Sequence, residues 1–493
     1  MMQISKSEYM LFLKHPAWLW LKKHDKNKLP PVSETLQAIF DEGNLFEKYA
    51  EQLFPNGVRI GFNGYDEYLN LPARTIKALK DGVKTIFQGR FEYGQITFIC
   101  DVIVVVGEKI VDLYEIKSST KVKPEHEFDL AFQMVVLEGC GYKINKIAVI
   151  HVNSEYVRSG DIDINKITAI SDITEKVKAR KEETKVNIKN ALQVAASSKI
   201  PDISPSLAKG NSFGEWLNIY RTLTTVDPES IYDLFMVNAA KIGELEKLKI
   251  KKLIDIHDRF FSLTDKQKLQ ILATKQNRKI IDKKKIGKFI KKLVFPLYFL
   301  DYETLSSVIP YFDGLTPYQQ IPFQYSLHVM DKPDEEIKHY MYLHKENSNP
   351  AKALSESIKL NISTKGSVIV WSESFEKNCN KSLGKLLPEF EQFYEELNER
   401  IIDLMIPFSC NWYVHKDFGG SASLKKVLPV LVTELSYKEL GIHEGDAAKR
   451  LWMEAFLDGK RESSKDQILN DLEEYCKLDT LAMVEIYKQL LKI

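Results

Sequence analysis

The sequence contains little cysteine and no long apolar run. Its 493 residues include five cysteines, at positions 100, 140, 379, 410 and 476, and none lies in a C-x-x-C pair. A disulfide framework or a cysteine zinc site is therefore not expected, and a reducing, cytoplasmic compartment fits best. Uncharged apolar runs such as Leu293–Leu300 are far shorter than the ~20 residues that a spanning helix needs. Because MMQISKSEYM also lacks an apolar signal region, we expect neither a secreted nor a membrane-spanning protein.

The sequence also lacks an excess of either charge. Its 69 Lys and Arg nearly balance 68 Asp and Glu, so the net charge of +1 favours neither nucleic acid nor membrane. The charges are unevenly distributed, however. Between Lys241 and Lys292 there are 17 basic against six acidic residues, a local charge of +11 that leaves −10 for the rest. Lysine runs are usually solvated faces, but this segment, with Lys283, Lys284 and Lys285, is also suited to follow a nucleic-acid backbone.

A chain of this length is expected to form two or three domains. Up to about residue 200, helical patterns such as Tyr9–Lys22 precede strand-like stretches from Gln88 to Lys117. Residues 201–292 contain only helical patterns and begin with a stretch rich in Ser and Pro, typical of a linker. From residue 293 onward, apolar strands alternate with helices. The sequence therefore predicts a multidomain α/β protein with segments 1–200, 201–292 and 293–493.

Residues 97–117, TFICDVIVVVGEKIVDLYEIK, form two apolar strands around a turn. If Gly107–Lys109 is a three-residue hairpin loop, Val106 pairs with Ile110, and the register places Asp101 opposite Glu115. Lys117 follows two residues later and emerges on the same face. Unpaired carboxylates are costly there, and a divalent cation is a natural partner, with Lys117 orienting water or stabilising developing charge. The alternative is an edge hairpin with a solvated Glu–Lys pair.

The surroundings of this hairpin resemble the RecB-like branch of the PD-(D/E)XK nuclease superfamily. An early helix with acids, including Glu47, precedes the D…E-x-K hairpin, and a helix with Gln133 in DLAFQMVVLEG follows it. The resemblance implies a restriction-endonuclease-like domain over residues 1–200, in which Asp101, Glu115, Lys117 and Gln133 are catalytic and Asp101 and Glu115 bind metal.

Two positions depart from that pattern. Many relatives have a metal-binding histidine on the early helix, where Glu47 stands here, and a carboxylate can replace it for Mg²⁺ or Mn²⁺. Some relatives carry a four-cysteine iron–sulfur cluster. Because the early position reads KHPAWLWL and no later cysteine cluster exists, we expect no cluster.

A second set of acids lies in the third segment. LVFPLYFLDYETLS is a buried-type strand ending in D-x-E, so Asp301 and Glu303 share a face at its carboxyl end, where open α/β sheets bind ligands. EEYCKLDTLAMVEIYKQLL places Tyr475 and Asp479 one helical turn apart. Each motif alone is weak, because solvated acids and surface helix contacts give the same patterns. Between them, Glu376 follows one apolar strand and Asp403 lies within another.

Together these motifs resemble the DEDD exonucleases of the ribonuclease H-like fold, and the tyrosine indicates the DEDDy subtype. The resemblance implies that Asp301, Glu303 and Asp479 bind two divalent metals and that Tyr475 positions the attacking water. The second motif is usually an aspartate; here Glu376 takes that place, with Asp403 as the alternative. The complete layout resembles a bacterial family that fuses the two nuclease domains, through pieces such as YEIKSST, DLAFQ, LYFLDYET, FGGSASLKKVLP and YCKLDTLAMV.

FGGSASLKKVLP is a Gly/Ser turn before a helix, with Ser421 or Ser423 as the cap and Lys425 and Lys426 in the first turn. Amides and lysines at a helix start suit a phosphate, although a capped helix with solvated lysines is an equal alternative. The leading hypothesis is a two-site nuclease that uses Mg²⁺ or Mn²⁺ and acts on DNA rather than RNA. The alternatives are a nucleic-acid-binding scaffold with one or both sites inactive, and a ribonuclease.

Overall fold

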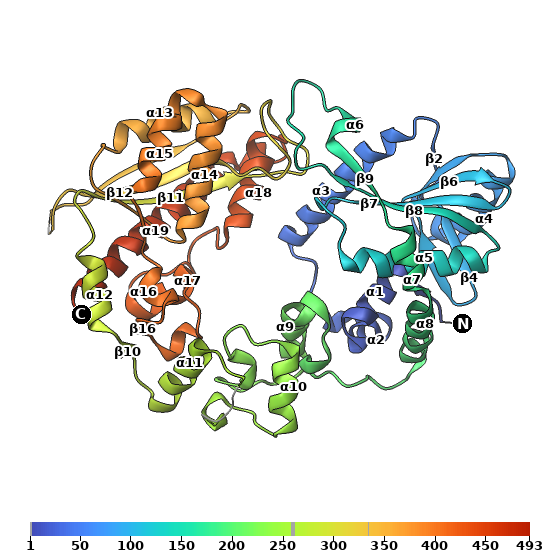
Figure 1. Cartoon of the computed structure of the whole chain (residues 1–493), viewed down its shortest axis with the longest axis horizontal. Helices are drawn as coiled ribbons and strands as arrows, with labels where there is room; N and C mark the ends of the chain where they lie inside the picture. Colours follow the sequence, from blue (N-terminus) through green and yellow to red (C-terminus); the bar gives the residue numbers. More distant parts are fainter. Residues whose placement is uncertain (1, 258–261, 334) are drawn as a thin grey trace. The chain divides into compact units, whose positions relative to one another are not determined.

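The computed structural model describes residues 2–257, 262–333 and 335–493. It is a mixed α/β, multidomain structure that divides into two compact units (Figure 1). The first unit comprises residues 1–226 and 238–244, and the second comprises residues 227–237 and 245–493. The segment 201–292 is thus shared between the units. The reason is visible in the packing: Trp216 is buried against the N-terminal helices, whereas Ile286 and Phe289 belong to a core of the second unit.

The first unit contains a six-stranded sheet in the order β2-β3-β6-β7-β8-β9 and a small sheet in the order β1-β5-β4. Its strands are β1 (Ile4–Ser5), β2 (Val58–Arg59), β3 (Thr85–Phe87), β4 (Arg90–Tyr93), β5 (Ile96–Ile99), β6 (Val102–Gly107), β7 (Ile110–Lys117), β8 (Lys143–Val152) and β9 (Thr168–Asp172). Its helices are α1 (Lys6–Lys14), α2 (Pro16–His24), α3 (Glu34–Ala50), α4 (Tyr65–Lys80), α5 (Pro124–Gly139), α6 (Ile164–Ile167), α7 (Thr174–Ala179), α8 (Lys181–Ala196) and α9 (Phe213–Leu223).

The helix expected over Tyr9–Lys22 is two helices. They meet at His15, whose extended backbone caps the end of α1 and the start of α2. The following proline explains the break, because proline disfavours the helical conformation in the residue before it and suits the first turn of a new helix.

The hairpin of β6 and β7 has the expected register with a different turn. Ile103 pairs with Leu113 and Val102 with Tyr114, which places Asp101, just before β6, across from Glu115. The loop is shorter than expected, because Gly107 rather than Val106 pairs with Ile110 and the register shifts after Val105. A bulge adds one residue to one strand and leaves the pairing beyond it unchanged. Helix α5 then connects β7 to the parallel strand β8.

The second unit is built on a five-stranded sheet in the order β13-β12-β11-β14-β15. Its strands are β10 (Ile280–Ile281), β11 (Leu297–Leu305), β12 (Ile321–Met330), β13 (Lys338–Leu343), β14 (Ser367–Val370), β15 (Ile401–Asp403) and β16 (Tyr413–Val414). Its helices are α11 (Asp265–Gln276), α12 (Lys283–Ile290), α13 (Ala351–Asn361), α14 (Glu373–Leu386), α15 (Glu391–Glu399), α16 (Ile406–Ser409), α17 (Leu424–Leu431), α18 (Gly445–Phe456) and α19 (Lys465–Leu491); α10 (Ala239–Lys247) spans the boundary between the units.

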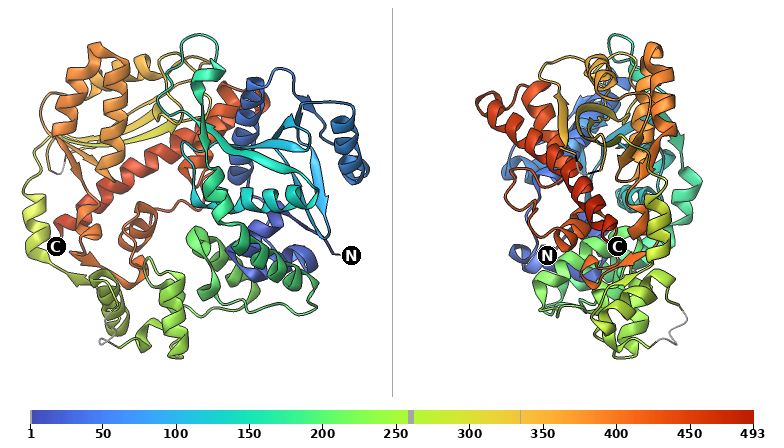
Figure 2. Two further views of the ribbon diagram at one scale, coloured as in Figure 1. Left: turned by 45° about the vertical axis from the view of Figure 1, so that its right-hand side comes forward. Right: turned by 90° about the vertical axis from the view of Figure 1, so that its left-hand side faces the viewer.

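Different helices pack against the two faces of this sheet. Strand β11 is antiparallel to β12 and parallel to β14, which is parallel to β15. Tyr298, Leu300 and Tyr302 of β11 pack in one core with α13, α14 and α15. Leu297 and Phe299 point to the other face and pack with the C-terminal half of α19. Figure 2 shows the orange helices and the red α19 on the two sides of the yellow strands. Asp301 and Glu303 share the parity of Phe299 and therefore face α19.

Among the described residues, no helix combines the length and apolar character needed to cross a bilayer. The five cysteines are free thiols.

Candidate active sites

Glu115 is the centre of a buried polar cluster in the first unit. It is 1% exposed and accepts hydrogen bonds on both carboxylate oxygens. Lys117 Nζ lies 2.6 Å and Lys6 Nζ 2.8 Å from Oε1, and Gln133 Nε2 donates to Oε2 at 2.6 Å. Burial alone would raise the pKa of Glu115, but Lys117 and Lys6 outweigh it and lower the pKa. Glu115 is therefore held ionised inside the protein. Of the predicted residues, Glu115, Lys117 and Gln133 are brought into direct contact.

Asp129 joins this cluster from α5. It lies one turn before Gln133, which donates to it at 3.0 Å, and Lys117 Nζ also lies 3.0 Å away. Lys6 Nζ lies 3.5 Å from Asp129 Oδ1. Two lysines thus sit between two carboxylates, and the ion pairs raise the pKa of Lys117. The i, i+4 spacing to Gln133 was a signal in the sequence that would have identified Asp129.

Asp101 lies beside Glu115 in a different electrostatic state. One carboxylate oxygen accepts the backbone N–H of Ile116 at 2.7 Å. Burial and the charge of Glu115 raise the pKa of Asp101 to about 8, although Lys6 and Lys117 act in the opposite direction. The positive charges of Lys6 and Lys117 therefore do not fully offset the effects of burial and of the Glu115 charge on Asp101. A divalent cation between Asp101 and Glu115 would supply the missing positive charge, so the donor set fits Mg²⁺ or Mn²⁺.

Glu47 approaches this site from α3, as expected, and its charge contributes to the raised pKa of Asp101. Its carboxylate is also engaged elsewhere. Gln88 Nε2 donates to it at 2.6 Å, and Arg59 lies 3.1 Å away. Both contacts are to Oε1, so Oε2 is the oxygen with which Glu47 would act as the third metal-binding carboxylate.

The second cluster lies on the face of β11 that α19 covers. Asp301 and Glu303 are within the strand rather than at its end, because β11 continues to Leu305. The spacing of two still places both side chains on one face, as predicted. Glu303 is 7% exposed and burial, with the charges of Asp301 and Asp479, raises its pKa well above the usual range. Burial and Asp479 also raise the pKa of Asp301.

Helix α19 brings Tyr475 and Asp479 to these carboxylates. Asp479 is 7% exposed, and burial raises its pKa to about 6. The hydroxyl of Tyr437 donates to its Oδ1, which lowers the pKa in part. Tyr475 is buried, and the charges of Asp479, Glu303 and Asp301 all raise the pKa of its phenol beyond the effect of burial. The phenol therefore stays neutral and is available as a hydrogen-bond donor among the acids.

Glu376, rather than Asp403, faces the cluster. It lies in the first turn of α14, is 1% exposed, and its Oε2 has no hydrogen-bond partner among the described residues. Burial and the charge of Asp301 raise its pKa well above the usual range. Asp403 instead accepts the backbone N–H groups of Ser372, Glu373 and Met405 at 3.1, 3.2 and 2.8 Å. Its carboxylate is used to cap the start of α14, as helix N-termini favour.

Three buried carboxylates and the half-buried Asp301, with only partial compensation of their charge, fit divalent cations. An unpaired buried carboxylate oxygen is costly, and Glu376 Oε2 lacks a hydrogen-bond partner within the described ranges. Several carboxylate oxygens in one cluster are suitable ligands for Mg²⁺ or Mn²⁺. Asp301, Glu303, Glu376 and Asp479 are thus the residues that would hold metal in the second unit.

The Gly/Ser turn precedes α17. Lys425, in the first turn of that helix, is near enough to the carboxylates of the second unit to influence their pKa values. Ser423 occupies the cap position of α17 and its backbone N–H donates to Ser421 Oγ at 3.2 Å, but the side chain of Ser423 makes no capping bond. Lys425 donates to the carbonyl of His443 and lies 5.2 Å from the ring centre of Tyr475. Its charge lowers the pKa values of Asp301, Glu303 and Asp479.

Gly420 is required in the turn, because φ is +72° and a Cβ would lie 2.4 Å from Phe235 Cβ.

Lys283, Lys284 and Lys285 occupy the first turn of α12 and are all exposed. Lys285 forms an ion pair with Asp282 at 3.3 Å, and the same aspartate accepts its backbone N–H. The structure therefore places the three lysines at the surface, while Ile286 and Phe289 anchor the helix.

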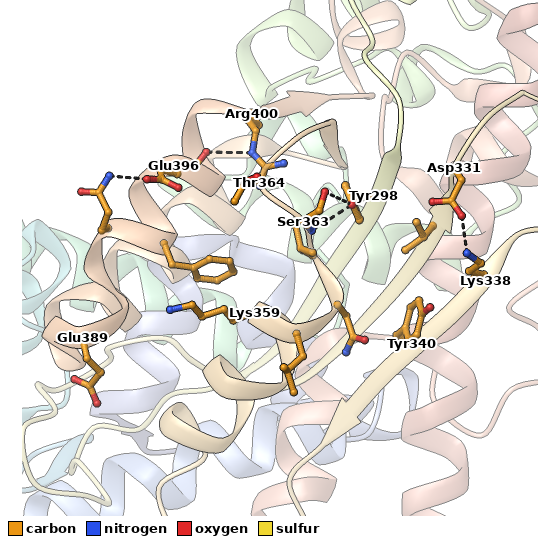
Figure 3. A pocket seen from close by; sticks show the side chains of 16 residues that line it. Tyr298, Asp331, Lys338, Tyr340, Lys359, Ser363, Thr364, Glu389, Glu396 and Arg400 are labelled. Atoms are coloured by element: carbon orange, nitrogen blue, oxygen red, sulfur yellow. Dashed lines mark hydrogen bonds and ion pairs between the residues drawn. The ribbon is translucent and has the colours of Figure 1, made fainter.

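A cavity of about 580 Å³ lies on the opposite face of the same sheet (Figure 3). Tyr298 and Tyr340 line it, together with residues from the end of α13 and from α15. Several of its charged groups are already paired: Lys338 contacts Asp331 at 2.6 Å, and Arg400 donates to the carbonyl of Glu396. This cavity is separate from the carboxylate cluster, because Tyr298 points away from the face of Asp301.

Sequence comparisons add relatives without a described activity. Residues 298–423 match the domain of unknown function DUF2779, a range that includes Asp301, Glu303 and Glu376 and ends before Tyr475. Uncharacterized protein MG366 of Mycoplasma genitalium is 29% identical over 222 residues, or 41% of this chain and 32% of that protein. Its Mycoplasma pneumoniae homolog is 25% identical over 317 residues, or 61% and 46%. The matches therefore span less than half of these relatives.

Proposed function

We propose that this protein is a metal-dependent nuclease that acts on DNA and has one active site in each unit. The observation that carries the proposal is the cluster of Asp301, Glu303, Glu376 and Asp479 beside the phenol of Tyr475. Three of these four carboxylates are buried, and the charge of Asp301 raises the pKa values of both Glu303 and Glu376. The order of the five-stranded sheet, with β12 antiparallel to the central β11, is consistent with the ribonuclease H-like fold that the motifs predicted. The contact of Gln133 with Glu115 supports the RecB-like site in the same way.

The residues of the second unit are suited to phosphodiester hydrolysis. When bound, Mg²⁺ or Mn²⁺ supplies activation of water and stabilisation of charge on the leaving oxygen. Asp301, Glu303, Glu376 and Asp479 bind the cation, and the Tyr475 hydroxyl, held neutral by its acidic neighbours, orients the attacking water. Tyr437 fixes the orientation of Asp479 through its hydrogen bond. In that arrangement the domain removes nucleotides from 3′ ends.

The residues of the first unit support a separate hydrolytic site. Asp101 and Glu115 bind the cation, and Gln133 and Lys6 hold the Glu115 carboxylate in place. The ammonium group of Lys117 lies beside the same carboxylate and can donate to a water molecule or to charge developing on a phosphate. This site cuts or trims DNA.

The test uses labelled single-stranded and double-stranded DNA and RNA, incubated with the full chain in Mg²⁺, Mn²⁺ or EDTA. We expect degradation of DNA that requires metal. Degradation of RNA alone would make the protein a ribonuclease. Binding without degradation under every condition would establish the scaffold alternative, in which the sites have lost activity.

A further inference from the structure

Cys476 places a thiol sulfur beside the carboxylates of the second unit. It follows Tyr475 on α19, is fully buried, and its Sγ lies 3.8 Å from Asp301 Oδ2. One ligand atom from each of Asp301, Glu303 and Cys476 lies within 4.8 Å of the others. Zinc bonds of ~2.3 Å to sulfur and ~2.1 Å to oxygen at a tetrahedral angle separate the two ligand atoms by about 3.6 Å. The spacing of Cys476 and Asp301 is therefore close to that of a shared zinc ion.

A second observation also indicates a cation at this position. Glu303 is 7% exposed, and in the described part of the chain its carboxylate makes no hydrogen bond or ion pair. Its Oε2 would lie 3.6 Å from a Cβ added at Gly445, so the space on that side is narrow. Glu376 contributes a further buried oxygen without a partner, near enough to Asp301 for their charges to interact. Oxygen atoms buried in this way need a positive charge nearby.

We propose that Asp301, Glu303 and Cys476 form a binding site for a thiophilic divalent cation, with Zn²⁺ as the expected ion and Cd²⁺ as its spectroscopic substitute. Carboxylates alone favour Mg²⁺ and Mn²⁺, whereas one thiolate ligand shifts preference toward softer ions. Formation of the sulfur–metal bond releases the thiol proton to solvent, and no oxidant or reductant takes part.

The consequence for activity rests on the proposed nuclease function, because Asp301 and Glu303 are also its metal ligands. Zn²⁺ held by Cys476 excludes Mg²⁺ from these two carboxylates and therefore inhibits the second unit. The binding site itself does not depend on catalysis. Metal binding and nuclease activity are tested separately, since metal binding is measured without nucleic acid.

The binding experiment is a Cd²⁺ titration of the full chain, followed by the ultraviolet sulfur-to-cadmium charge-transfer absorption. We expect one equivalent to bind in the wild type, at least tenfold weaker binding in Cys476→Ser, and unchanged binding in Cys379→Ser, a matched control for a buried cysteine of the same unit. Excess Mn²⁺ should raise the Cd²⁺ concentration needed for half saturation. A signal that persists in Cys476→Ser, or disappears in Cys379→Ser or Cys410→Ser instead, overturns the site.

A second measurement needs no variant and covers the case in which Cys476→Ser does not fold. Zinc X-ray absorption of the wild-type protein should show one sulfur at about 2.3 Å together with oxygen ligands. Coordination by oxygen and nitrogen alone overturns the proposal. If the nuclease is active, Zn²⁺ should inhibit the second site at least tenfold more weakly in Cys476→Ser than in the wild type. Cd²⁺ binding in an inactive protein would refute the nuclease and leave this metal site established.

Discussion

The ammonium group of Lys6 lies 2.8 Å from Glu115 Oε1, although 109 residues separate the two in the sequence. Lys117 contacts the same oxygen at 2.6 Å. Lys6 is fixed there because α1 starts at this residue, and Ser5 and Glu8 form a capping box at that start. The N-terminal helix is therefore part of the candidate site of the first unit, and it holds Glu115 in its ionised form.

Replacing Lys6 with methionine should destabilise the first unit by about 1.5–3 kcal/mol, the range for a hydrogen bond to a charged group. The loss is not larger, because Lys117 and Gln133 still contact Glu115. Lys14→Met is the matched control: the ion pair of Lys14 with Glu215 is 44% and 57% exposed, so the expected change is below about 1 kcal/mol. Urea unfolding of both variants measures the difference. Equal effects would contradict the role of Lys6.

The two sites should be independent, because each unit contains its own set of carboxylates. We expect Asp101→Ala or Lys117→Ala to abolish one cleavage activity and leave the other within about twofold. Asp301→Ala should abolish the other cleavage activity and leave the first intact. The measurement compares end-trimming and internal cleavage of labelled DNA by each folded variant. If one substitution eliminated all cleavage, a single composite site would replace the two-site proposal.

Metal binding should stabilise the second unit, because the carboxylates of its cluster repel one another without cations. At a free Mn²⁺ concentration 100 times its dissociation constant the gain is about 2.7 kcal/mol, visible as a rise in Tm. Asp301→Ala and Glu376→Gln should remove most of this rise in Tm, whereas Tyr475→Phe should keep the rise and reduce only the rate of cleavage.

Asp403→Asn should lower Tm with the Mn²⁺ response intact, since Asp403 caps α14. Loss of the response in Asp403→Asn alone would reassign the fourth carboxylate.

Replacing Lys283, Lys284 and Lys285 with glutamine should weaken DNA binding without changing the metal requirement. All three are exposed, so the fold should not suffer. Each lost phosphate contact should make the dependence of log K on log salt shallower by about one. Lys176, Lys178 and Lys185, exposed on the first unit, provide a control triple substitution. Affinity and slope that match the wild type would make the α12 lysines an ordinary solvated surface.

His15 should make the first unit less stable in acid. It is fully buried, accepts the N–H of Ala17 on Nδ1, and contacts the carbonyl of Ser204 through Nε2 at 3.0 Å. Burial lowers its pKa from 6.5 to about 4. The unfolded chain then binds a proton that the folded chain does not, so stability falls as pH decreases from about 6.5 to 4, by on the order of 3 kcal/mol.

The measurement for His15 is Tm across that pH range, in the wild type and in His15→Asn. The asparagine variant has no proton to gain, so its Tm should fall less steeply on acidification. Parallel curves would show that other groups carry the acid sensitivity.

Relationships over short sequence distances were predictable. The register of β6 and β7, the common face of Asp301 and Glu303, and the stacking of Tyr475 and Asp479 follow from the fixed periods of strands and helices, which are set by backbone geometry. The contact of Gln133 with Glu115 was reached only through family resemblance, because 18 residues separate them on two different elements.

Tertiary packing decided the rest. Nothing near Lys6 in the sequence indicates Glu115, and nothing near Tyr437 indicates Asp479, 42 residues away, because such contacts depend on how whole elements dock. Resemblance alone placed Glu376 ahead of Asp403 in the sequence. The fold gives Asp403 three backbone N–H groups and leaves Glu376 Oε2 buried without a partner among the described residues. The periods of strands and helices specify which acids share a face, since local geometry is short-ranged. Which of these acids have compensated charges depends on the complete fold, since burial and neighbouring charge are properties of the folded chain.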